Sequence, residues 1–333
     1  MKIVNCSDIT NPDWRFLEGK VGKGQEWKFF SSSPKNWLER LITSPKLSRL
    51  RACFESVQYA KEKKAQVLIT HLPLTTWWCG EFAGNAFPAK QLAFAFNFTT
   101  LPQGLRRYRM AKAFQRIDRF VVFSNFERKL YSAYFDIPIN KIMMTHWAVQ
   151  PPIPAFLPPT LPRNYICAIG SNSRDYPLLM KAMEALPHIS LVLVTSLEAC
   201  RNLHIPPNVK VLSNLPIQEV WNVIQHSQFM VLPLQHAEVP CGHVTLVNSL
   251  FLKKPVIITA SVGIEDYIQD GFNGVTVPPG DRKAFIEAIS KLWETPSLLQ
   301  ALGENGVSFA QTHCTEAAMC KFLEKQINDL TTP

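Results

Sequence analysis

Short apolar runs alternate with amphipathic segments along the first half of the chain. A continuous apolar run of a few residues is typical of a buried strand, whereas apolar residues three or four positions apart are typical of a helix. The predicted elements are strand Lys2–Cys6, helix Leu47–Lys64, strand Gln66–Thr70, strand Gln91–Asn97, strand Arg119–Phe123, helix Phe126–Phe135 and strand Lys141–Thr145. This alternation indicates a parallel sheet with crossover helices.

The pattern is interrupted by a proline-rich stretch, Gln150–Pro162, with six prolines in thirteen positions. Each proline fixes φ and lacks an amide donor, so the stretch forms neither a helix interior nor a central strand. We therefore expect a linker over 151–164, an N-terminal domain over 1–150 and a C-terminal domain over 165–315.

The alternation resumes after the linker. The predicted elements are strand Tyr165–Ile169, helix Pro177–Ala185, strand Ser190–Thr195, strand Val209–Leu212, helix Ile217–His226, strand Phe229–Leu232, helix Thr245–Phe251, strand Pro255–Thr259, strand Val275–Val277 and helix Arg282–Glu294. A last helix, about 316–330, has no strand after it and is expected to pack back on the first domain. The predicted fold class is α/β, with two doubly wound, Rossmann-like domains in tandem.

Charge is unevenly distributed over these halves. Residues 1–150 carry 23 Lys and Arg against 11 Asp and Glu, a net +12, whereas residues 151–333 carry 12 against 15, a net −3. A basic first half favours an anionic partner, such as nucleic acid, a membrane surface or a phosphorylated acceptor. A surface charge that only serves solubility is the alternative. Nucleic acid is disfavoured, because the basic residues are not interleaved with aromatics in a recognisable module.

Hydropathy and cysteine spacing indicate where the protein resides and the state of its thiols. No apolar run reaches the length of a membrane span, and the N-terminus lacks a signal-peptide pattern. The eight cysteines include no C-x-x-C pair and no zinc-like spacing, so we interpret them as reduced packing thiols and expect no metal. We expect a cytoplasmic protein, with peripheral contact at the inner face of the plasma membrane left open by the basic half.

Two strand-to-helix turns of the second half offer anion-binding chemistry. In the first, Gly170 lets the backbone approach a ligand, Ser171 can donate a hydrogen bond, and Arg174 could clamp a diphosphate. In the second, the amides of Gly242, His243 and Val244 would face an anion placed at the start of the next helix. The alternatives are a plain turn with an exposed Arg174, and a helix start with a surface His243.

Polar groups beside the second turn add possible sugar contacts. Glu238 could accept from sugar hydroxyls, and Asn248 could reach ribose hydroxyls. Cys241 is as well explained by packing as by ligand contact.

In the first half, His71 directly follows a predicted strand, where it could orient a sugar, and a purely structural role is the alternative. Trp77 could stack on a sugar ring, although core packing explains it as well. Arg106 and Arg107 begin a basic helical face that also includes Arg109, Lys112, Arg116 and Arg119. Such a face could receive an anionic acceptor or lie on acidic lipid, and an ordinary solvated face is the alternative.

Several motifs are absent. The sequence has no G-x-G-x-x-G, P-loop, G-x-S-x-G or H-E-x-x-H motif, and no Asp-x-Asp that would hold a divalent ion. A leaving diphosphate would then depend on Arg174, backbone amides and a helix N-terminus.

Taken together, the blocks of the second half resemble GT-B glycosyltransferases of family four. The similar blocks are Tyr165–Gly170 with Arg174, Val209–Leu234, Cys241–Gly242 with Lys254–Ile257, Gly263–Gly274 and Val277–Asp281. The resemblance implies two Rossmann-like domains facing across a cleft, with a nucleotide-sugar donor between them. The first half is similar in architecture only, around Ser124 and Ile137–Val149.

The resemblance also implies roles for single residues. Arg174 matches the basic residue that holds the donor diphosphate, while Ser171 stands where a second basic residue is usual. Asn248 takes the place of an acidic ribose contact. Glu238 is ten residues before it, where the family spacing of eight falls on Pro240, so its sugar contact departs from the pattern.

Further site residues follow from the same resemblance. The segment 213–216, with Asn214 and Leu215, falls at the base-binding position, and His71 falls where many members carry a His near the reacting sugar. The donor-binding set implied by residues and resemblance together is Gly170, Ser171, Arg174, Asn214, Leu215, Glu238, Cys241, Gly242, His243, Val244, Thr245 and Asn248.

The resulting prediction is a retaining, metal-independent glycosyltransferase that needs no cofactor besides its UDP-sugar donor. His71, Arg174 and Glu238 are the expected catalytic residues, with Trp77, Arg106 and Arg107 on the acceptor side. UDP-glucose is the first choice of donor, and a glycan or polyprenyl-diphosphate-linked acceptor of polysaccharide synthesis is the expected partner. A nucleotide-sugar epimerase or phosphorylase on the same fold, or a non-catalytic sugar-nucleotide-binding scaffold, remains the alternative.

Overall fold

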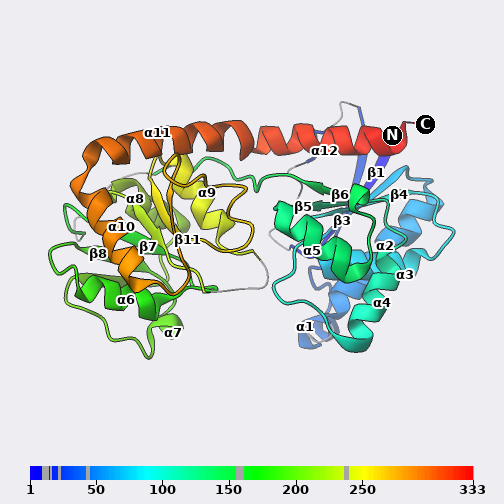
Figure 1. The fold of residues 1–333 in the computed structure, drawn as a ribbon. Coiled ribbons are helices and arrows are strands. Elements are labelled where there is room, and N and C mark those ends of the chain that lie inside the picture. Colours follow the sequence, from blue (N-terminus) through cyan, green and yellow to red (C-terminus); the bar gives the residue numbers. More distant parts are fainter. Residues whose placement is uncertain are drawn as a thin grey trace. The chain divides into compact units, whose positions relative to one another are not determined.

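The computed structural model describes residues 1–9, 15, 17–21, 24–42, 46–154, 161–235 and 240–332. The chain forms two compact units. Unit 1 consists of Met1–Thr145 with Met319–Pro333, and unit 2 of His146–Ala318. Each unit is a parallel six-stranded sheet with helices packed against it (Figure 1), which confirms the predicted α/β class with two Rossmann-like units.

The sheet of unit 1 has the strand order β2-β1-β3-β4-β5-β6. Its strands are β1 (Lys2–Ser7), β2 (Glu26–Ser31), β3 (Val67–His71), β4 (Lys90–Phe94), β5 (Arg119–Val122) and β6 (Ile142–Met144). Its helices are α1 (Trp37–Leu41), α2 (Leu47–Glu62), α3 (Pro73–Ala83), α4 (Gly104–Phe114), α5 (Asn125–Phe135) and the 3-10 turn η1 (Ile139–Lys141). The predicted elements occur within a few residues of these bounds. β2, α1 and α3 were not predicted.

The last helix, α12 (Glu316–Thr331), joins unit 1 from Met319 onward. The guanidinium of Arg119 at the start of β5 donates to the side-chain oxygen of Gln326 at 2.8 Å and pairs with Asp329 at 3.7 Å. These contacts attach the C-terminal helix α12 to the sheet of unit 1.

The sheet of unit 2 has the order β12-β11-β10-β7-β8-β9. Its strands are β7 (Ile166–Ile169), β8 (Leu191–Val194), β9 (Val209–Leu212), β10 (Met230–Leu232), β11 (Val256–Thr259) and β12 (Val275–Val277). Its helices are α6 (Tyr176–Glu184), α7 (Leu197–Cys200), α8 (Ile217–His226), α9 (His243–Phe251), α10 (Arg282–Glu294) and α11 (Pro296–His313). Helices α7 and α11 were not predicted.

Each sheet has a point where the direction of strand addition reverses. In unit 2 the chain moves from β7 to β8 and β9 on one side and then crosses to β10 on the other. In unit 1 the reversal lies between β1 and β3. Ligands of open parallel sheets bind beyond the carboxyl ends of the strands at such a point. The loops after β7, β10, β1 and β3 are therefore the expected positions of functional residues.

Candidate active site

The loops after β7 and β10 are joined to each other at the reversal point of unit 2. The amide of Asp175 donates to the carbonyl of Pro233, and the amide of Gln235 donates to the carbonyl of Ser173, both at 3.0 Å. Arg174 and Leu234 form an antiparallel bridge between them. These bonds hold the turn that carries Arg174 against the segment that leads into α9.

Gly170 is required where β7 ends. Its φ of +106° is unfavourable for any residue with a Cβ, and a Cβ there would lie 2.8 Å from Nη2 of Arg174. Ser171, next along, accepts from the amide of Ser196 at 3.0 Å and lies 3.1 Å from the hydroxyl of Thr195. The hydroxyl of Ser171 therefore holds the neighbouring loop in place.

Arg174 is a buried cation, with only 8% of its surface exposed. Its guanidinium donates to the carbonyls of Ile169 at 3.2 Å and Asn172 at 2.7 Å, and to the hydroxyl of Thr245 at 3.3 Å. None of the carboxylates in the described ranges pairs with it, and burial lowers its pKa. A buried charge without a counter-ion is costly, so this position favours a bound anion.

The N-terminus of α9 opens beside this guanidinium. Gly242 is the N-cap, with φ +88° and no side-chain cap bond, and no acidic residue occupies the first turn. A Cβ at Gly242 would approach the side chains of Leu232 and Leu234 to 3.3 Å. The first-turn amides of His243, Val244 and Thr245 lack a partner within their own helix, as at every helix start. The N-terminus of α9 lies beside the guanidinium of Arg174, because Thr245 in the first turn contacts Arg174 directly. The positive end of the helix dipole and the guanidinium together form an electropositive centre.

The other predicted residues of this loop lie nearby but differ in role. His243 is buried against the ring of Tyr267, with 4.5 Å between ring centroids, and burial lowers its pKa to about 4. Its side chain is therefore a neutral packing group, and only its amide faces the helix end. Cys241 is partly buried, and burial raises the pKa of its thiol, against the smaller opposing effects of Arg174 and Ser173.

Asn248 lies one turn further along α9 and donates to the carbonyl of Val244 at 2.8 Å. Asn214, with φ +55°, is exposed in the turn between β9 and α8, and Leu215 beside it packs against the core of unit 2. Glu238 lies outside the described residues.

A pocket of about 350 Å³ adjoins the Arg174 turn within unit 2. Ser173, Arg174 and Gln235 line one part of it, and Glu198 and Asn202 another. Polar groups therefore line part of a space next to the buried cation, together with the apolar Pro177, Ala199 and Leu203.

In unit 1, His71 ends β3 at the reversal point and is fully buried. Its Nε2 lies 2.6 Å from the side-chain oxygen of Asn5 on β1, and burial lowers its pKa to about 3, so the ring is neutral at pH 7. Trp77 belongs to the core, stacked on Trp78, with its indole donating to Glu81 at 3.1 Å.

The basic face of α4 is only partly as predicted. Arg106 and Arg107 are exposed on the helix, and Arg107 donates twice to the carbonyl of Tyr134, at 3.0 and 2.9 Å. The helix ends at Phe114, so Arg116 and Arg119 are not part of its face.

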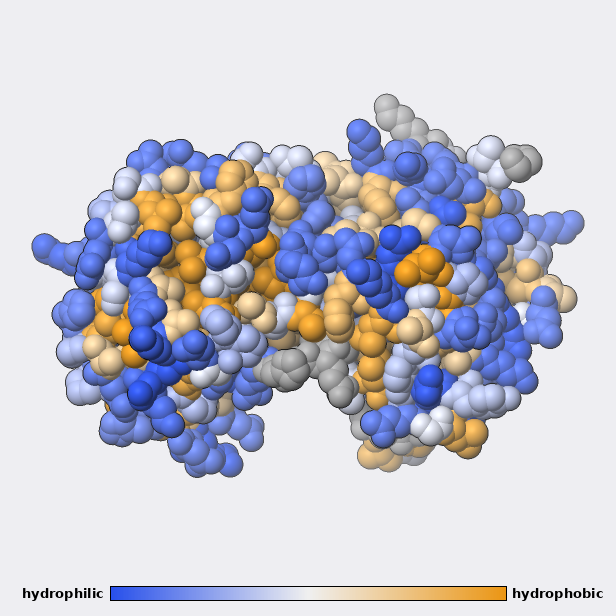
Figure 2. All heavy atoms as spheres, viewed as in Figure 1, coloured by the Kyte–Doolittle hydropathy of each residue, from blue (hydrophilic) through white to orange (hydrophobic). Residues whose placement is uncertain are grey.

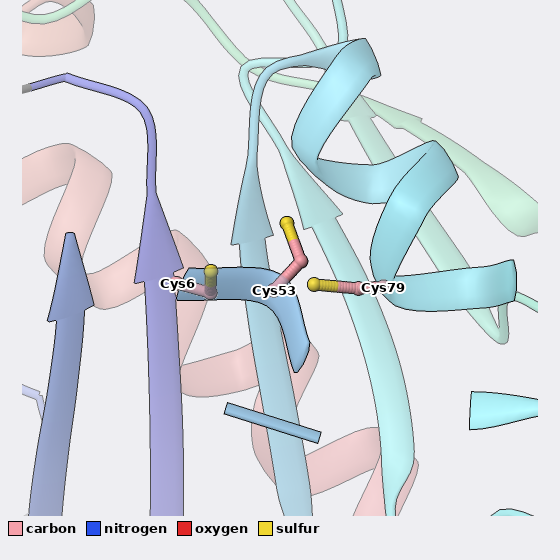
Figure 3. Close-up of side chains that lie close together, drawn as sticks. All are labelled: Cys6, Cys53 and Cys79. Atoms are coloured by element: carbon pink, nitrogen blue, oxygen red, sulfur yellow. The ribbon is translucent and has the colours of Figure 1, made fainter. Parts of the chain in front are cut away.

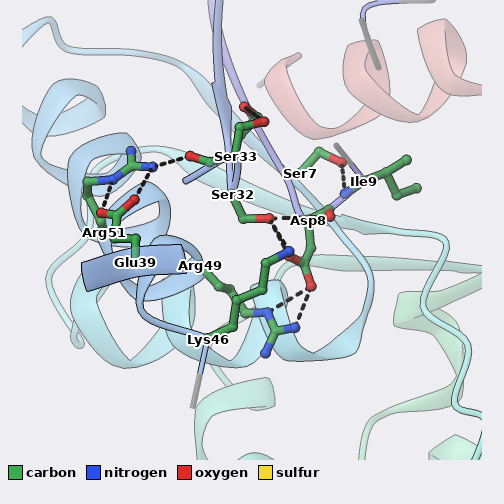
Figure 4. A network of polar contacts seen from close by, with 10 residues as sticks. Ser7, Asp8, Ile9, Ser32, Ser33, Glu39, Lys46, Arg49 and Arg51 are labelled. Atoms are coloured by element: carbon green, nitrogen blue, oxygen red, sulfur yellow. Dashed lines mark hydrogen bonds and ion pairs between the residues drawn. The ribbon is translucent and has the colours of Figure 1, made fainter. Parts of the chain in front are cut away.

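A charged network that was not predicted follows β1 (Figure 4). The carboxylate of Asp8 accepts from Lys46 at 2.8 Å, from Nε of Arg49 at 2.8 Å, and from the hydroxyl of Ser32. Burial acts to raise the pKa of Asp8, but these hydrogen bonds outweigh it and the pKa is lowered. Two cations on one carboxylate leave positive charge at the carboxyl end of β1. The position of Asp8 directly after a strand was the available sequence signal.

Comparison with known families tests the resemblance. Residues 170–309 match the model described as Glycosyl transferases group 1. This chain is a glycosyltransferase. The matched segment contains the Arg174 turn, both loops at the reversal point and helix α9. No curated protein matches the sequence.

Solved structures show that this glycosyltransferase has the GT-B fold. A sucrose-phosphate synthase from Thermosynechococcus elongatus aligns with a TM-score of 0.76 at 14% identity, covering 99% of each chain. Anabaena Alr3699/HepE in complex with UDP aligns with a TM-score of 0.74 at 12% identity, covering 99% of this chain and 100% of that one. A glycosyltransferase from Rickettsia africae gives 0.73 at 15% identity, covering 99% and 98%. Within the described ranges, no helix has the length and apolarity that crossing a membrane requires.

Proposed function

We propose that this glycosyltransferase moves a hexose from a UDP-sugar to a glycan or lipid-linked acceptor, with the donor diphosphate at the reversal point of unit 2. The observation that carries the proposal is the buried guanidinium of Arg174, which has no carboxylate partner among the described residues and adjoins the uncapped start of α9. A diphosphate would supply the missing negative charge to both groups.

UDP is the proposed nucleotide and UDP-glucose the first choice of donor. Support comes from the HepE structures of the same fold, whose complexes contain UDP, UDP-glucose, or UDP with glucose. In the proposed site, the turn of Asn214 and Leu215 contacts the base, and Asn248 contacts the ribose. Glu238 stays the predicted sugar contact.

We propose transfer with retention and without metal. The bond between the anomeric carbon and the diphosphate oxygen breaks, and the acceptor oxygen attacks the same face of the sugar. The acceptor proton passes to the leaving diphosphate oxygen, so no protein nucleophile is required. Arg174 and the first-turn amides of α9 stabilise the negative charge that develops on the diphosphate.

The acceptor is proposed to be an anionic, lipid-linked glycan met at a membrane surface in envelope or exopolysaccharide assembly. Residues 1–150 carry the positive charge, and on α4 the exposed Leu105 and Tyr108 adjoin Arg106 and Arg107. Figure 2 shows hydrophobic surface at the end of unit 1 where α1 and α4 lie. Basic and apolar side chains together suit an anionic lipid surface.

A melting-temperature screen against UDP-, GDP- and ADP-glucose tests the nucleotide. Binding to the folded state raises the melting temperature by mass action, so UDP-glucose is expected to give the largest shift. Product analysis on UDP-glucose without acceptor separates transfer from epimerisation. A changed sugar configuration would identify an epimerase, and slow hydrolysis of the donor would contradict a non-catalytic scaffold.

Vesicle pelleting tests the membrane contact. We expect the chain to pellet with vesicles that contain anionic lipid and to be released by salt. The charge reversal Arg106→Glu should weaken pelleting, whereas Lys210→Glu in unit 2 serves as the matched control. Equal pelleting with neutral vesicles, or none with either, contradicts the proposed surface.

A further inference from the structure

Three cysteines from separate elements of unit 1 meet in its core (Figure 3). Cys6 comes from β1, Cys53 from α2 and Cys79 from α3, and each is fully buried. Their sulfur atoms all lie within 4.8 Å of one another. In the described part of the chain this is the only group of three or more His, Cys, Asp or Glu side chains with such spacing.

The distances suit a single metal ion. A metal–sulfur bond of about 2.3 Å places the three sulfurs of a planar trigonal site about 4 Å apart. The three thiols therefore need to move by less than about 1 Å each to surround an ion. Side-chain rotation covers such a distance without a change in the backbone.

The surroundings select the type of ion. The group offers sulfur alone, and sulfur ligands favour soft ions such as Cu(I) or zinc. Structural zinc is almost always four-coordinate. The hydroxyl of Ser56 lies 3.7 Å from the sulfur of Cys79, but it already donates to the carbonyl of Cys53 at 2.8 Å. The thiol of Cys53 donates to the carbonyl of Thr75 at 3.7 Å. Apolar neighbours include Val4, Val57 and Leu68.

Coordination number gives the same preference. Cysteines bind metal as thiolates, so each of the three thiols that binds releases its proton. Three sulfurs complete the shell of Cu(I), whereas structural zinc needs a fourth ligand that this group does not supply.

We propose that Cys6, Cys53 and Cys79 form a three-sulfur site for one soft monovalent metal ion of the Cu(I) class. The bound ion links β1, α2 and α3, which pack directly against the strand that ends in His71. The site is separate from the proposed donor position and independent of the proposed function.

Anaerobic competition with a chromogenic Cu(I) chelator tests the site on the reduced full chain. Since the thiols are buried, the ion enters through local opening and the mixture is brought to equilibrium before reading. We expect one Cu(I) per chain to resist the chelator, and Cu(I) to raise the melting temperature by about 5 °C. Cys53→Ala and Cys79→Ala should each weaken Cu(I) binding at least about 100-fold.

Two control variants keep the test specific. Cys314→Ala removes an equally buried thiol outside the group, and Cys200→Ala removes a partly exposed one; both should bind Cu(I) like the unaltered chain. X-ray absorption of the unaltered chain gives an answer even where a variant fails to fold, with a shell of three sulfurs expected. Binding that survives in both Cys53→Ala and Cys79→Ala, nitrogen or oxygen in the shell, or tighter binding of Zn(II) than of Cu(I) would each overturn the proposal.

Discussion

Replacing Arg174 by alanine removes the cation that the proposed diphosphate needs. The guanidinium makes three hydrogen bonds within unit 2 and has no carboxylate partner among the described residues. A strong donor to a developing anion contributes about 2–4 kcal/mol to the transition state, so Arg174→Ala should lower kcat/KM about 30- to 900-fold. Arg174→Lys keeps a charge but loses the forked geometry, so an intermediate loss is expected.

The same variant also loses structural bonds, because Arg174 donates to the carbonyls of Ile169 and Asn172. A nucleotide series separates the two roles. Uridine carries no phosphate, so its affinity should be the same in the unaltered chain and in Arg174→Ala. The affinity for UDP should fall, and the affinity for UMP should fall less.

Calorimetric titration of uridine, UMP and UDP against both proteins gives these differences directly. Equal losses of affinity for uridine and for UDP would show that the turn is no longer folded in the variant and that Arg174 has only a structural role. Unchanged UDP affinity together with full turnover of the donor would refute the assignment of the diphosphate to this turn.

Three further predictions concern stability. Gly303→Ala should destabilise the chain by about 1–3 kcal/mol in denaturant melts, because its Cβ would come within 2.6 Å of the carbonyl of Lys253. Gly306→Ala should cost less, because its nearest contact is the side chain of Leu250 at 3.0 Å and the nearest backbone atom lies at 3.6 Å. Burial raises the pKa of Glu127 from 4.5 to about 7, so the folded state holds this proton more tightly than the unfolded state does. Roughly 3 kcal/mol of folding stability that is present at pH 4.5 is therefore lost as the pH rises to 7. Glu127→Gln cannot ionise and should flatten this loss of stability. His243 changes stability in the opposite direction, because burial lowers its pKa from 6.5 to about 4. Roughly 3 kcal/mol of folding stability that is present above pH 6.5 is therefore lost as the pH falls to 4. His243→Phe should remove this pH dependence. Urea melts from pH 4 to 8 would contradict either assignment if the variant kept the slope of the unaltered chain.

The elements that the sequence predicted well are those whose local pattern and tertiary packing agree. The bounds of α8, β12 and α10 are as predicted, and Asp281 caps α10 by accepting from the amide of Ala284 at 3.0 Å. A short run of β-branched residues and a capped amphipathic helix carry their signals in neighbouring residues.

The missed elements depend on distant partners. Helix α11 has Gly303 and Gly306 in its interior, which disfavour a helix locally. Both glycines face α9 and its end, where a Cβ would contact Lys253 or Leu250. Close packing between α9 and α11 therefore explains the two glycines, although helix propensity alone would predict an end of the helix there. Similarly, α3 carries two tryptophans and a glycine, and it is stabilised by burial in the core of unit 1.

The same division applies to the site. Arg174 and Gly242 could be found because the turns that carry them stand at strand ends and match a family pattern. The burial of His243 could not, because it depends on Tyr267, which lies 24 positions further along the sequence. The thiol group could not be found either, because its cysteines are separated by 47 and 26 positions and show no metal-like spacing.

Strand order is what converts the scattered residues of unit 2 into a site. Arg174 follows β7 and Thr245 begins the helix after β10, 71 positions apart in sequence, yet they are 3.3 Å apart because β7 and β10 are neighbours in the sheet. A parallel sheet that added strands in one direction only would separate these two loops by several strand widths of almost 5 Å each. The reversal therefore does two things at once. It brings a buried guanidinium to a helix N-terminus, and it leaves the space beyond both strands free of a crossover helix. A diphosphate placed there satisfies the cation that the fold has buried, which is why chemistry and topology identify the same place.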